Sequence, residues 1–540
     1  MKRLHPILPF PHFRIFAFFL ALLLTVPAQA QRRSDTDEVS FEMVKKLQIA
    51  QLAITQLYVD SVDQNKLVED AINGMLEKLD PHSAYSNAEE TKKFNEPLEG
   101  NFEGIGIQFN VLEDTVVVIQ TISKGPSEKA GLLPGDRLVT CDGDTIAGVK
   151  MTRDSIMHRL RGPKDSKVVL GILRRGNNGL VDYTIKRDKI PVNTLGAAYM
   201  ITPTVGYIEL DRFGATSGKE VKDAIADLKK QGMQALILDL QNNGGGYLGA
   251  SVEVASQFLP KDALVVYTDG RNVRRQTMTA EGGGLFLDGP LVILVDESTA
   301  SAAEIVSGAV QDHDRGTIIG RRTFGKGLVQ RPVELPDGSM IRLTVSHYYT
   351  PTGRCIQKPY VKGQKEDYQN DLNDRYKHGE LTSLDSIHLD STKVYRTLRD
   401  ERIVYGGGGI MPDVFVPLDT TTFSKYYIDV RRLGLFNTVS LKYIDHERKA
   451  LKKRYKQFED FLRDYTVPQT LIDQLIAEAE EKSVKPKDDE ELQKTIPDFQ
   501  FILKALVAYD VWDRNEYFRI INDRSDTVKA ALRYLQEAQP

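Results

Sequence analysis

Two short segments carry residue types that could perform acyl-transfer chemistry together. The first, VDESTASAAEIVSGAV, runs from an apolar strand through a turn into a helix that begins near Ser301. A serine there has its hydroxyl at the positive end of the helix dipole, and the amide of Ala302 can point at an oxyanion. The same S-x-x-E spacing is also a capping box, in which Ser301 caps the helix and Glu304 returns the bond. On this motif alone we favour capping.

The second segment, GRRTFGKGLVQ, places Lys326 between Gly325 and Gly327. Read from Gly320, it matches a phosphate-binding P-loop up to the lysine, but such a loop needs Ser or Thr next and a helix beyond. Gly327 follows instead, and the run LVQRPVELPDGSMIRLTVSHYY alternates like two strands around a Pro-Asp-Gly turn. The segment therefore does not predict a nucleotide site.

Lys326 follows Ser301 by one helix and one strand, TIIG, which can return it to the same end of a parallel sheet. A neutral lysine can replace histidine as a general base, and burial without a carboxylate partner lowers its pKa. The sequence contains no G-x-S-x-G elbow and no H-E-x-x-H helix. Outside the first thirty residues the histidines are scattered: His82, His158, His313, His347, His378, His388 and His446. The pattern favours a Ser–Lys dyad over a histidine triad.

A third segment, LDLQNNGGGYLG, ends an apolar strand in three glycines, Gly244 to Gly246. Such a turn can expose a backbone N–H that pairs with the amide of Ala302 and completes an oxyanion hole. Without the other two segments, it indicates only a flexible strand end.

These segments require a scaffold of alternating strands and helices. From residue 192 to about 350, apolar strands such as VGYIEL, ALILDL and PLVILVDE alternate with helical segments such as SGKEVKDAIADLKKQG. This order predicts an α/β core domain, which we extend over residues 192–418. A polar, charge-dense stretch at about 356–400 interrupts it and is predicted to be a surface excursion.

Residues 95–191 resemble a PDZ domain in nearly every segment, from EGIGIQFN to GPSEKAGLLPGDRL. In such a domain a glycine turn exposes amides that hold a peptide carboxylate, while a strand edge accepts the extended peptide. Here Gly104, Ile105, Gly106 and Ile107 would form that turn, and Leu132 would help the two isoleucines to line an apolar pocket. The preferred ligand would be a free C-terminus that ends in an apolar residue.

The remaining regions are assigned from their composition. Residues 1–30 carry basic residues, the apolar run IFAFFLALLLTV and an A-x-A site, which is typical of a signal peptide cleaved after Ala30. Residues 31–94 predict amphipathic helices, and residues 419–540 predict a separate helical module broken at Pro468, Pro486 and Pro497. With 41% hydrophobic residues and a net charge of -4, nothing indicates nucleic-acid binding. The two cysteines, Cys141 and Cys355, give no disulfide framework.

Over about residues 41–418 the chain resembles the carboxyl-terminal processing peptidases, the tail-specific proteases. The segments that carry the resemblance occur in family order: LDPHSAY, the PDZ segment, RGPKDSKV, LDLQNNGGG, STASAAEI, TFGKGLVQ and GGGGIMPDV. The resemblance implies an α/β core related to the ClpP and crotonase fold, with an inserted PDZ domain. It also implies that Ser301 is the nucleophile, Lys326 its general base and Gln330 the residue that orients the lysine, with Glu304 behind them.

The resemblance further implies that the amide of Ala302 and that of Gly245 or Gly246 hold the oxyanion. The strand end departs from the family, because Gln241 and Gly244 stand where many members carry Arg and Pro. Which glycine completes the oxyanion hole therefore stays open.

The sequence thus predicts an exported serine endopeptidase of the periplasm or cell envelope that binds protein tails through its PDZ domain. No metal or cofactor is expected. Further partner predictions are peripheral membrane association and homo-oligomerisation through the helical regions. The alternative function is a non-catalytic exported PDZ scaffold on a protease-like core.

Overall fold

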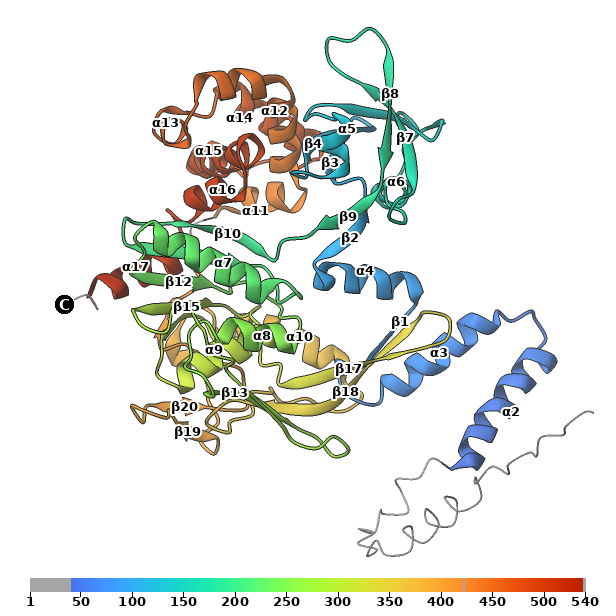
Figure 1. Ribbon diagram of the computed structural model, residues 1–540, viewed down its shortest axis with the longest axis vertical. Helices are drawn as coiled ribbons and strands as arrows, with labels where there is room; N and C mark the ends of the chain where they lie inside the picture. Colours follow the sequence, from blue (N-terminus) through green and yellow to red (C-terminus); the bar gives the residue numbers. More distant parts are fainter. Residues whose placement is uncertain (1–39, 421–422, 538–540) are drawn as a thin grey trace, which may run out of the picture. The chain divides into compact units, whose positions relative to one another are not determined.

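The computed structural model describes residues 40–420 and 423–537 (Figure 1). The predicted signal peptide, residues 1–30, lies outside these ranges. A short N-terminal unit ends at Ile72, and a large unit begins at Asn73. The predicted amphipathic helices are present as α2 (Phe41–Leu57) and α3 (Gln64–Leu76). Within the described ranges, no helix has both the length and the apolar character to cross a membrane.

The large unit contains a small β-domain at the predicted PDZ position. Its main sheet has the order β3-β4-β5-β7-β8, with β6 on β5, so that β3 is an edge strand. The elements are β3 (Ile107–Leu112), β4 (Thr115–Thr121), α5 (Pro126–Ala130), β5 (Arg137–Cys141), β6 (Asp144–Thr145), α6 (Arg153–Leu160), β7 (Lys167–Leu173) and β8 (Leu180–Lys186). Before and after them, β2 (Asn101–Gly104) and β9 (Asp188–Pro191) pair antiparallel and form a two-stranded neck.

The predicted α/β core is built around a six-stranded sheet of order β10-β11-β12-β15-β16-β21. Every neighbouring pair is parallel except β10 and β11. The strands are β10 (Leu195–Met200), β11 (Val205–Leu210), β12 (Ala235–Asp239), β15 (Leu291–Val295), β16 (Thr317–Gly320) and β21 (Val414–Phe415). Apolar runs such as VGYIEL form these strands because both faces of the sheet are covered.

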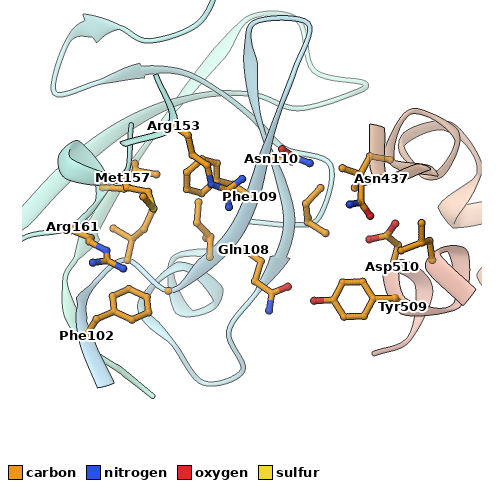
Figure 2. A pocket seen from close by; sticks show the side chains of 17 residues that line it. Phe102, Gln108, Phe109, Asn110, Arg153, Met157, Arg161, Asn437, Tyr509 and Asp510 are labelled. Carbon is orange, nitrogen blue, oxygen red and sulfur yellow. The ribbon is translucent and has the colours of Figure 1, made fainter. Parts of the chain in front are cut away.

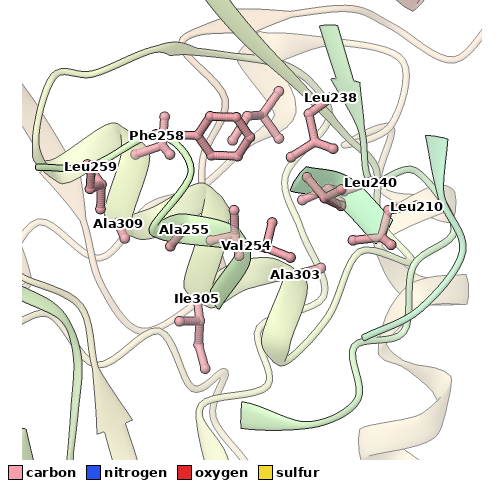
Figure 3. Close-up of a cluster of buried hydrophobic side chains, with 14 of the residues drawn as sticks. Leu210, Leu238, Leu240, Val254, Ala255, Phe258, Leu259, Ala303, Ile305 and Ala309 are labelled. Carbon is pink, nitrogen blue, oxygen red and sulfur yellow. The ribbon is translucent and has the colours of Figure 1, made fainter. Parts of the chain in front are cut away.

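The two faces of this sheet are covered by different helices. One face packs against α7 (Ser217–Lys230), α8 (Leu248–Ala255) and α9 (Ala302–Asp312). Figure 3 shows this cluster, in which Val254, Ala255 and Ala303 from the helices meet Leu238 and Leu240 from the sheet. The other face packs against α17 (Asp526–Glu537), near the C-terminus (Figure 1).

A second, antiparallel sheet brings the N-terminal motif LDPHSAY beside the core. Its strands are β1 (Ala84–Ser86), β13 (Leu264–Asp269), β14 (Gln276–Thr279), β17 (Leu328–Glu334) and β18 (Met340–Tyr349). The strands β17 and β18 form the hairpin that the sequence predicts around Pro-Asp-Gly. β1 pairs with β18. The N-terminal motif thus joins the sheet whose strand β17 begins just after Lys326.

The charge-dense stretch at 356–400 is largely exposed but has secondary structure of its own. It contains α10 (Lys365–Lys377), the short helix η2 (Leu384–Ser386) and β19 (Val394–Arg396), which pairs with β20 (Ile403–Tyr405). Arg375 and Glu380 are buried and form an ion pair at 2.7 Å, and Arg322 also bonds Glu380. These charged groups can be buried because they pair with one another. They pack against the segment that leads to Lys326.

The C-terminal region is helical, as predicted, and α11 to α15 share their own apolar core. These helices, followed by α16, are α11 (Lys425–Arg432), α12 (Leu435–Arg454), α13 (Phe458–Asp464), α14 (Gln469–Glu481), α15 (Asp489–Val511) and α16 (Arg514–Ile521). Two details differ from the sequence prediction. Pro497 lies inside α15 instead of ending a helix, because buried neighbours such as Phe499 and Leu503 hold that helix in place. The module is also not separate, since α17 packs on the core sheet.

Candidate active site

Ser301 lies at the turn between β15 and α9, in a strained backbone conformation. Its φ is 57° and its ψ is -116°, a region that non-glycine residues rarely occupy and that costs about 1–3 kcal/mol. Two contacts hold the turn: the amide of Ala300 donates to the Asn243 carbonyl at 2.9 Å, and the Tyr348 hydroxyl donates to the Ser301 carbonyl at 3.2 Å. The fold therefore fixes Ser301 at the N-cap of α9.

Glu304 is fully buried and connects the serine segment to the lysine segment. Its Oε2 accepts from the amides of Ser301 and Lys326, both at 2.9 Å. Its Oε1 accepts from the amide of Gly325 at 2.8 Å and from the hydroxyl of Thr323 at 2.5 Å. Burial raises the pKa of Glu304 to about 7, while these four donors oppose the rise. Glu304 returns the bond expected of the predicted capping box to the Ser301 amide, and the same carboxylate also fixes the backbone at Lys326.

The Lys326 ammonium is partly buried and has no salt-bridge partner among the described residues. Burial, followed by the positive charge of Arg342, lowers the pKa of Lys326, whereas Glu304 and Asp80 partly oppose this shift. A lysine in such surroundings is more readily neutral than one in water. This is the electrostatic condition for a lysine that accepts a proton.

One cavity of about 980 Å³ brings the predicted catalytic residues together. Ser301, Ala302, Lys326 and Gln330 all line it, and the glycine turn after β12 forms part of its wall. Glu304 does not line it and lies behind Ser301, as expected from its burial.

The glycine turn lies directly against the serine. A Cβ on Gly245 would be 2.7 Å from the Cβ of Ser301 and 2.9 Å from the Ala302 amide nitrogen, and the φ of Gly245 is 95°. Only glycine fits there without strain. The Gly245 amide, however, already donates to Asn243 Oδ1 at 2.8 Å.

The Gly246 amide has a different environment. Gly246 forms a parallel β-bridge with Phe213, in which the Phe213 amide donates to the Gly245 carbonyl and the Tyr247 amide donates to the Phe213 carbonyl. The Gly246 amide therefore faces away from Phe213. In the described chain, the amides of Gly246 and Ala302 have no acceptor. Of the two predicted glycines, Gly246 is therefore the one with a free donor.

Gln330 belongs to a hydrogen-bond chain that the sequence did not reveal. Its Nε2 donates to Thr344 Oγ1 at 3.1 Å, and the Thr344 hydroxyl donates to Asp80 Oδ1 at 2.8 Å. Asp80 also accepts from the hydroxyl of Ser83 at 2.5 Å and from the amide of His82 at 2.9 Å. Asp80 belongs to the segment LDPHSAY, for which the sequence predicted no role at the site.

His82 is the one histidine among the described residues that lines the cavity. Its Nε2 lies 2.9 Å from the Tyr368 hydroxyl. Burial and the nearby Lys326 charge lower the pKa of His82 to about 3, so the ring is neutral and a weak base at ordinary pH. This environment agrees with the preference for lysine over histidine as the base.

A second cavity, of about 460 Å³, lies along β3 and α6 of the PDZ region (Figure 2). Ile105, Gly106 and Ile107 line it as predicted, whereas Gly104 is part of β2 and is not in its lining. Leu132, which was also predicted for the pocket, is absent from its lining and lies in the apolar core of this region. Leu132 follows α5, but the groove is bordered by α6.

The glycine turn before β3 presents free backbone donors. The carbonyls of Ile105 and Gly106 accept from Ser127 and Ile122, whereas the amides of Ile105 and Gly106 have no acceptor in the described chain. Two adjacent free amides at the end of an edge strand suit a terminal carboxylate.

Four family models match the chain. Residues 204–369 match peptidase family S41, and residues 104–185 match the PDZ domain. Residues 24–91 match the N-terminal domain of the activating protease CtpB, and residues 426–513 match a family of unknown function.

Curated relatives agree with these matches. The carboxy-terminal processing protease CtpA of Bacillus subtilis is 34% identical over 67% of this chain and 81% of its own length. The carboxy-terminal-processing protease of Bartonella bacilliformis is 35% identical over 64% and 79%, respectively. Among structures, the photosystem II D1 C-terminal processing protease is 28% identical, with 70% of this chain and 94% of that chain covered and a TM-score of 0.35.

Proposed function

Since the chain belongs to the carboxy-terminal processing proteases of peptidase family S41, and is thus a PDZ-containing serine peptidase, we propose that Ser301 is its nucleophile and Lys326 its general base. The observation that carries this proposal is the Glu304 carboxylate. It binds the backbone amides of both residues, while their side chains line one cavity. The dyad is thus held by one rigid acceptor.

The proposed reaction follows from this arrangement. Neutral Lys326 accepts the Ser301 hydroxyl proton as Oγ attacks the scissile carbonyl carbon, and the amides of Ala302 and Gly246 stabilise the oxyanion. The ammonium then gives its proton to the leaving amine, which departs and leaves an acyl-enzyme. Water then attacks that ester while Lys326 takes one of its protons, and the lysine returns this proton to the departing Ser301 Oγ as the acid product is released. Gln330 orients the lysine.

We further propose that the PDZ domain selects the substrate by its free, apolar C-terminus. Support comes from the free amides of Ile105 and Gly106 and from the apolar side chains of Ile105 and Ile107 in the groove. Export is a separate proposal, which rests on the signal-peptide pattern of residues 1–30. The scaffold alternative is disfavoured, because Ser301 and Lys326 are both intact and share the cavity.

The test separates catalysis from stability. Ser301→Ala and Lys326→Ala should each slow cleavage of an unstructured protein by about a thousandfold or more, because each removes a reacting group. Loss of the cap alone would cost only about 1 kcal/mol of stability. Thermal melting and cleavage, followed by mass spectrometry, are measured on the same samples.

Ser307→Ala is the matched control, because Ser307 lies in the same helix and bonds only backbone carbonyls of that helix. It should cleave at the parental rate. A Ser301→Ala variant that melts early yet cleaves normally would show that Ser301 is only a helix cap.

A further inference from the structure

The groove along β3 has a second wall that the PDZ domain does not supply. Two helices of the C-terminal region line the same cavity opposite β3 (Figure 2). Their side chains are Asn437 and Leu441 from α12 and Leu506, Tyr509 and Asp510 from α15. These residues lie within the matched family of unknown function.

Ion pairs hold this second wall against the PDZ domain. The Asp445 carboxylate of α12 is 6% exposed and binds Arg137 at 2.8 Å and Arg175 at 3.1 Å. The helical region is in turn bound to the protease core, where Arg514 bonds Asp211. The wall is therefore built into the fold rather than formed by a loose contact.

The edge strand determines which side chains of a bound tail would meet this wall. A peptide added to β3 runs antiparallel to it, and its successive side chains point to opposite sides. The terminal side chain and the second residue before it would face the PDZ core and α6. The first and third residues before the terminus would face the other way, where Gln108 and Asn110 of β3 point toward Tyr509 and Asn437 (Figure 2).

The second wall carries an unpaired acid. The side chain of Asp510 points into the cavity between Asn437 and Tyr509 (Figure 2). Its carboxylate forms no salt bridge within the described ranges, and its one side-chain hydrogen bond, from Ser440, is long at 3.4 Å, while the Arg448 guanidinium donates to the backbone carbonyl of Asp510. Burial raises the pKa of Asp510 to about 6, although the charge of Arg448 opposes the rise. The α6 side of the groove instead carries Arg153 and Arg161, and Arg161 is paired with Glu96.

We propose that α12 and α15 form the second wall of the tail-binding groove, and that Asp510 selects a Lys or Arg side chain one or three residues before the substrate's C-terminal residue. This inference rests on the proposed tail recognition and extends it to the helical region. A basic side chain at the second position before the terminus gains nothing, because it faces α6 and its arginines.

Fluorescence anisotropy on the full chain tests the proposal. The Ser301→Ala variant is used so that the peptides are not consumed, at pH 8, where Asp510 is charged. Labelled unstructured peptides that end in an apolar residue carry a single Lys one, two or three residues before the end, or only Ala. Lysine at the first or third position should bind about five- to tenfold tighter than Ala, the range of a charge-assisted bond that is partly exposed. Lysine at the second position should show no gain.

Two further variants assign the effect. Asp510→Asn should abolish the lysine gain and leave the Ala peptide unchanged. Asp473→Asn, an equal charge change at an exposed position of α14, should keep the gain. Melting curves check that each variant folds. If Asp510→Asn is unstable, Asn437→Asp still tests the proposal. This change lies at an exposed position of the same wall and should increase the gain for lysine at the third position.

The outcomes separate the two proposals. A lysine gain that is the same at all three positions, or that survives Asp510→Asn, overturns this inference while tail recognition stands. An amidated Ala peptide is measured beside the free one, and equal binding of the two overturns tail recognition, and this inference with it.

Discussion

At the scale of single residues, the environment of Lys326 determines the direction of the pH dependence. Burial and Arg342 lower its pKa, so the neutral base forms at a lower pH than for a lysine in water. Activity should rise with pH as Lys326 loses its proton. Replacing Arg342 by Met removes a positive charge, raises the pKa of Lys326 and should move this rise to higher pH. The measurement is kcat/KM of peptide cleavage as a function of pH.

Two results would distinguish this base from a histidine. His82→Gln should leave the midpoint of the rise in place, because burial keeps the ring neutral across the working range. A midpoint near the ordinary histidine value of about 6.5 that disappears in His82→Gln would contradict the lysine base.

At the scale of elements, the pairing of β1 with β18 gives the N-terminal motif a role at the site. Asp80 reaches Gln330 through Thr344, and its charge also raises the pKa of Lys326. Asp80→Asn should lower kcat by about tenfold, since a hydrogen bond to a charged group contributes about 1.5–3 kcal/mol. The pH midpoint should move to lower pH, opposite to the Arg342 variant.

Asp337→Asn is the control for this prediction, because Asp337 bonds Ser339 in the turn of the same sheet. It should change neither kcat nor the midpoint. A lower melting temperature of Asp80→Asn with an unchanged pH profile would indicate a purely structural role for Asp80.

The elements also show what the sequence can and cannot predict. Apolar strands, helix starts and the Pro-Asp-Gly turn are local signals, so the α/β core, the β17–β18 hairpin and the PDZ domain were predicted correctly. The motifs of Ser301 and Lys326 predicted one shared site for the same reason. The link from Asp80 to Thr344 joins distant parts of the chain, and no local pattern encodes it.

Two further details were out of reach of the sequence for the same physical reason: the oxyanion glycine, which it left open, and the position of Leu132. The donation from Gly245 to Asn243 depends on a side-chain orientation that a run of glycines does not reveal. Leu132 was expected in the peptide pocket, but the choice between α5 and α6 as the groove wall depends on how the sheet folds over them.

At the scale of the whole molecule, Asp445 couples the PDZ domain to the helical region. Asp445→Ala leaves Arg137 and Arg175 without their carboxylate and should loosen the second wall of the groove. Cleavage of a long unstructured substrate should fall about tenfold, mainly through KM, because a nearly buried acid is lost from two pairs. A short peptide that reaches Ser301 without the PDZ domain should be cut at the parental rate.

Asp464→Ala provides the comparison, since Asp464 is an exposed acid of the same region that pairs with its neighbour Arg463. It should leave both substrates unaffected. Equal losses for the long and the short substrate in Asp445→Ala would mean that the pair supports the whole fold rather than the groove.

The position of α17 determines when the core sheet can be fully covered. Its Val528, Ala531 and Leu535 cover the sheet face formed by strands such as β12 and β15, the latter leading directly to Ser301. During synthesis, Ser301 and Lys326 leave the ribosome long before α17 does. Until then, one side of the catalytic sheet faces water and its apolar residues are unshielded. The sheet that leads to Ser301 is thus covered on both faces only after α17 has been made.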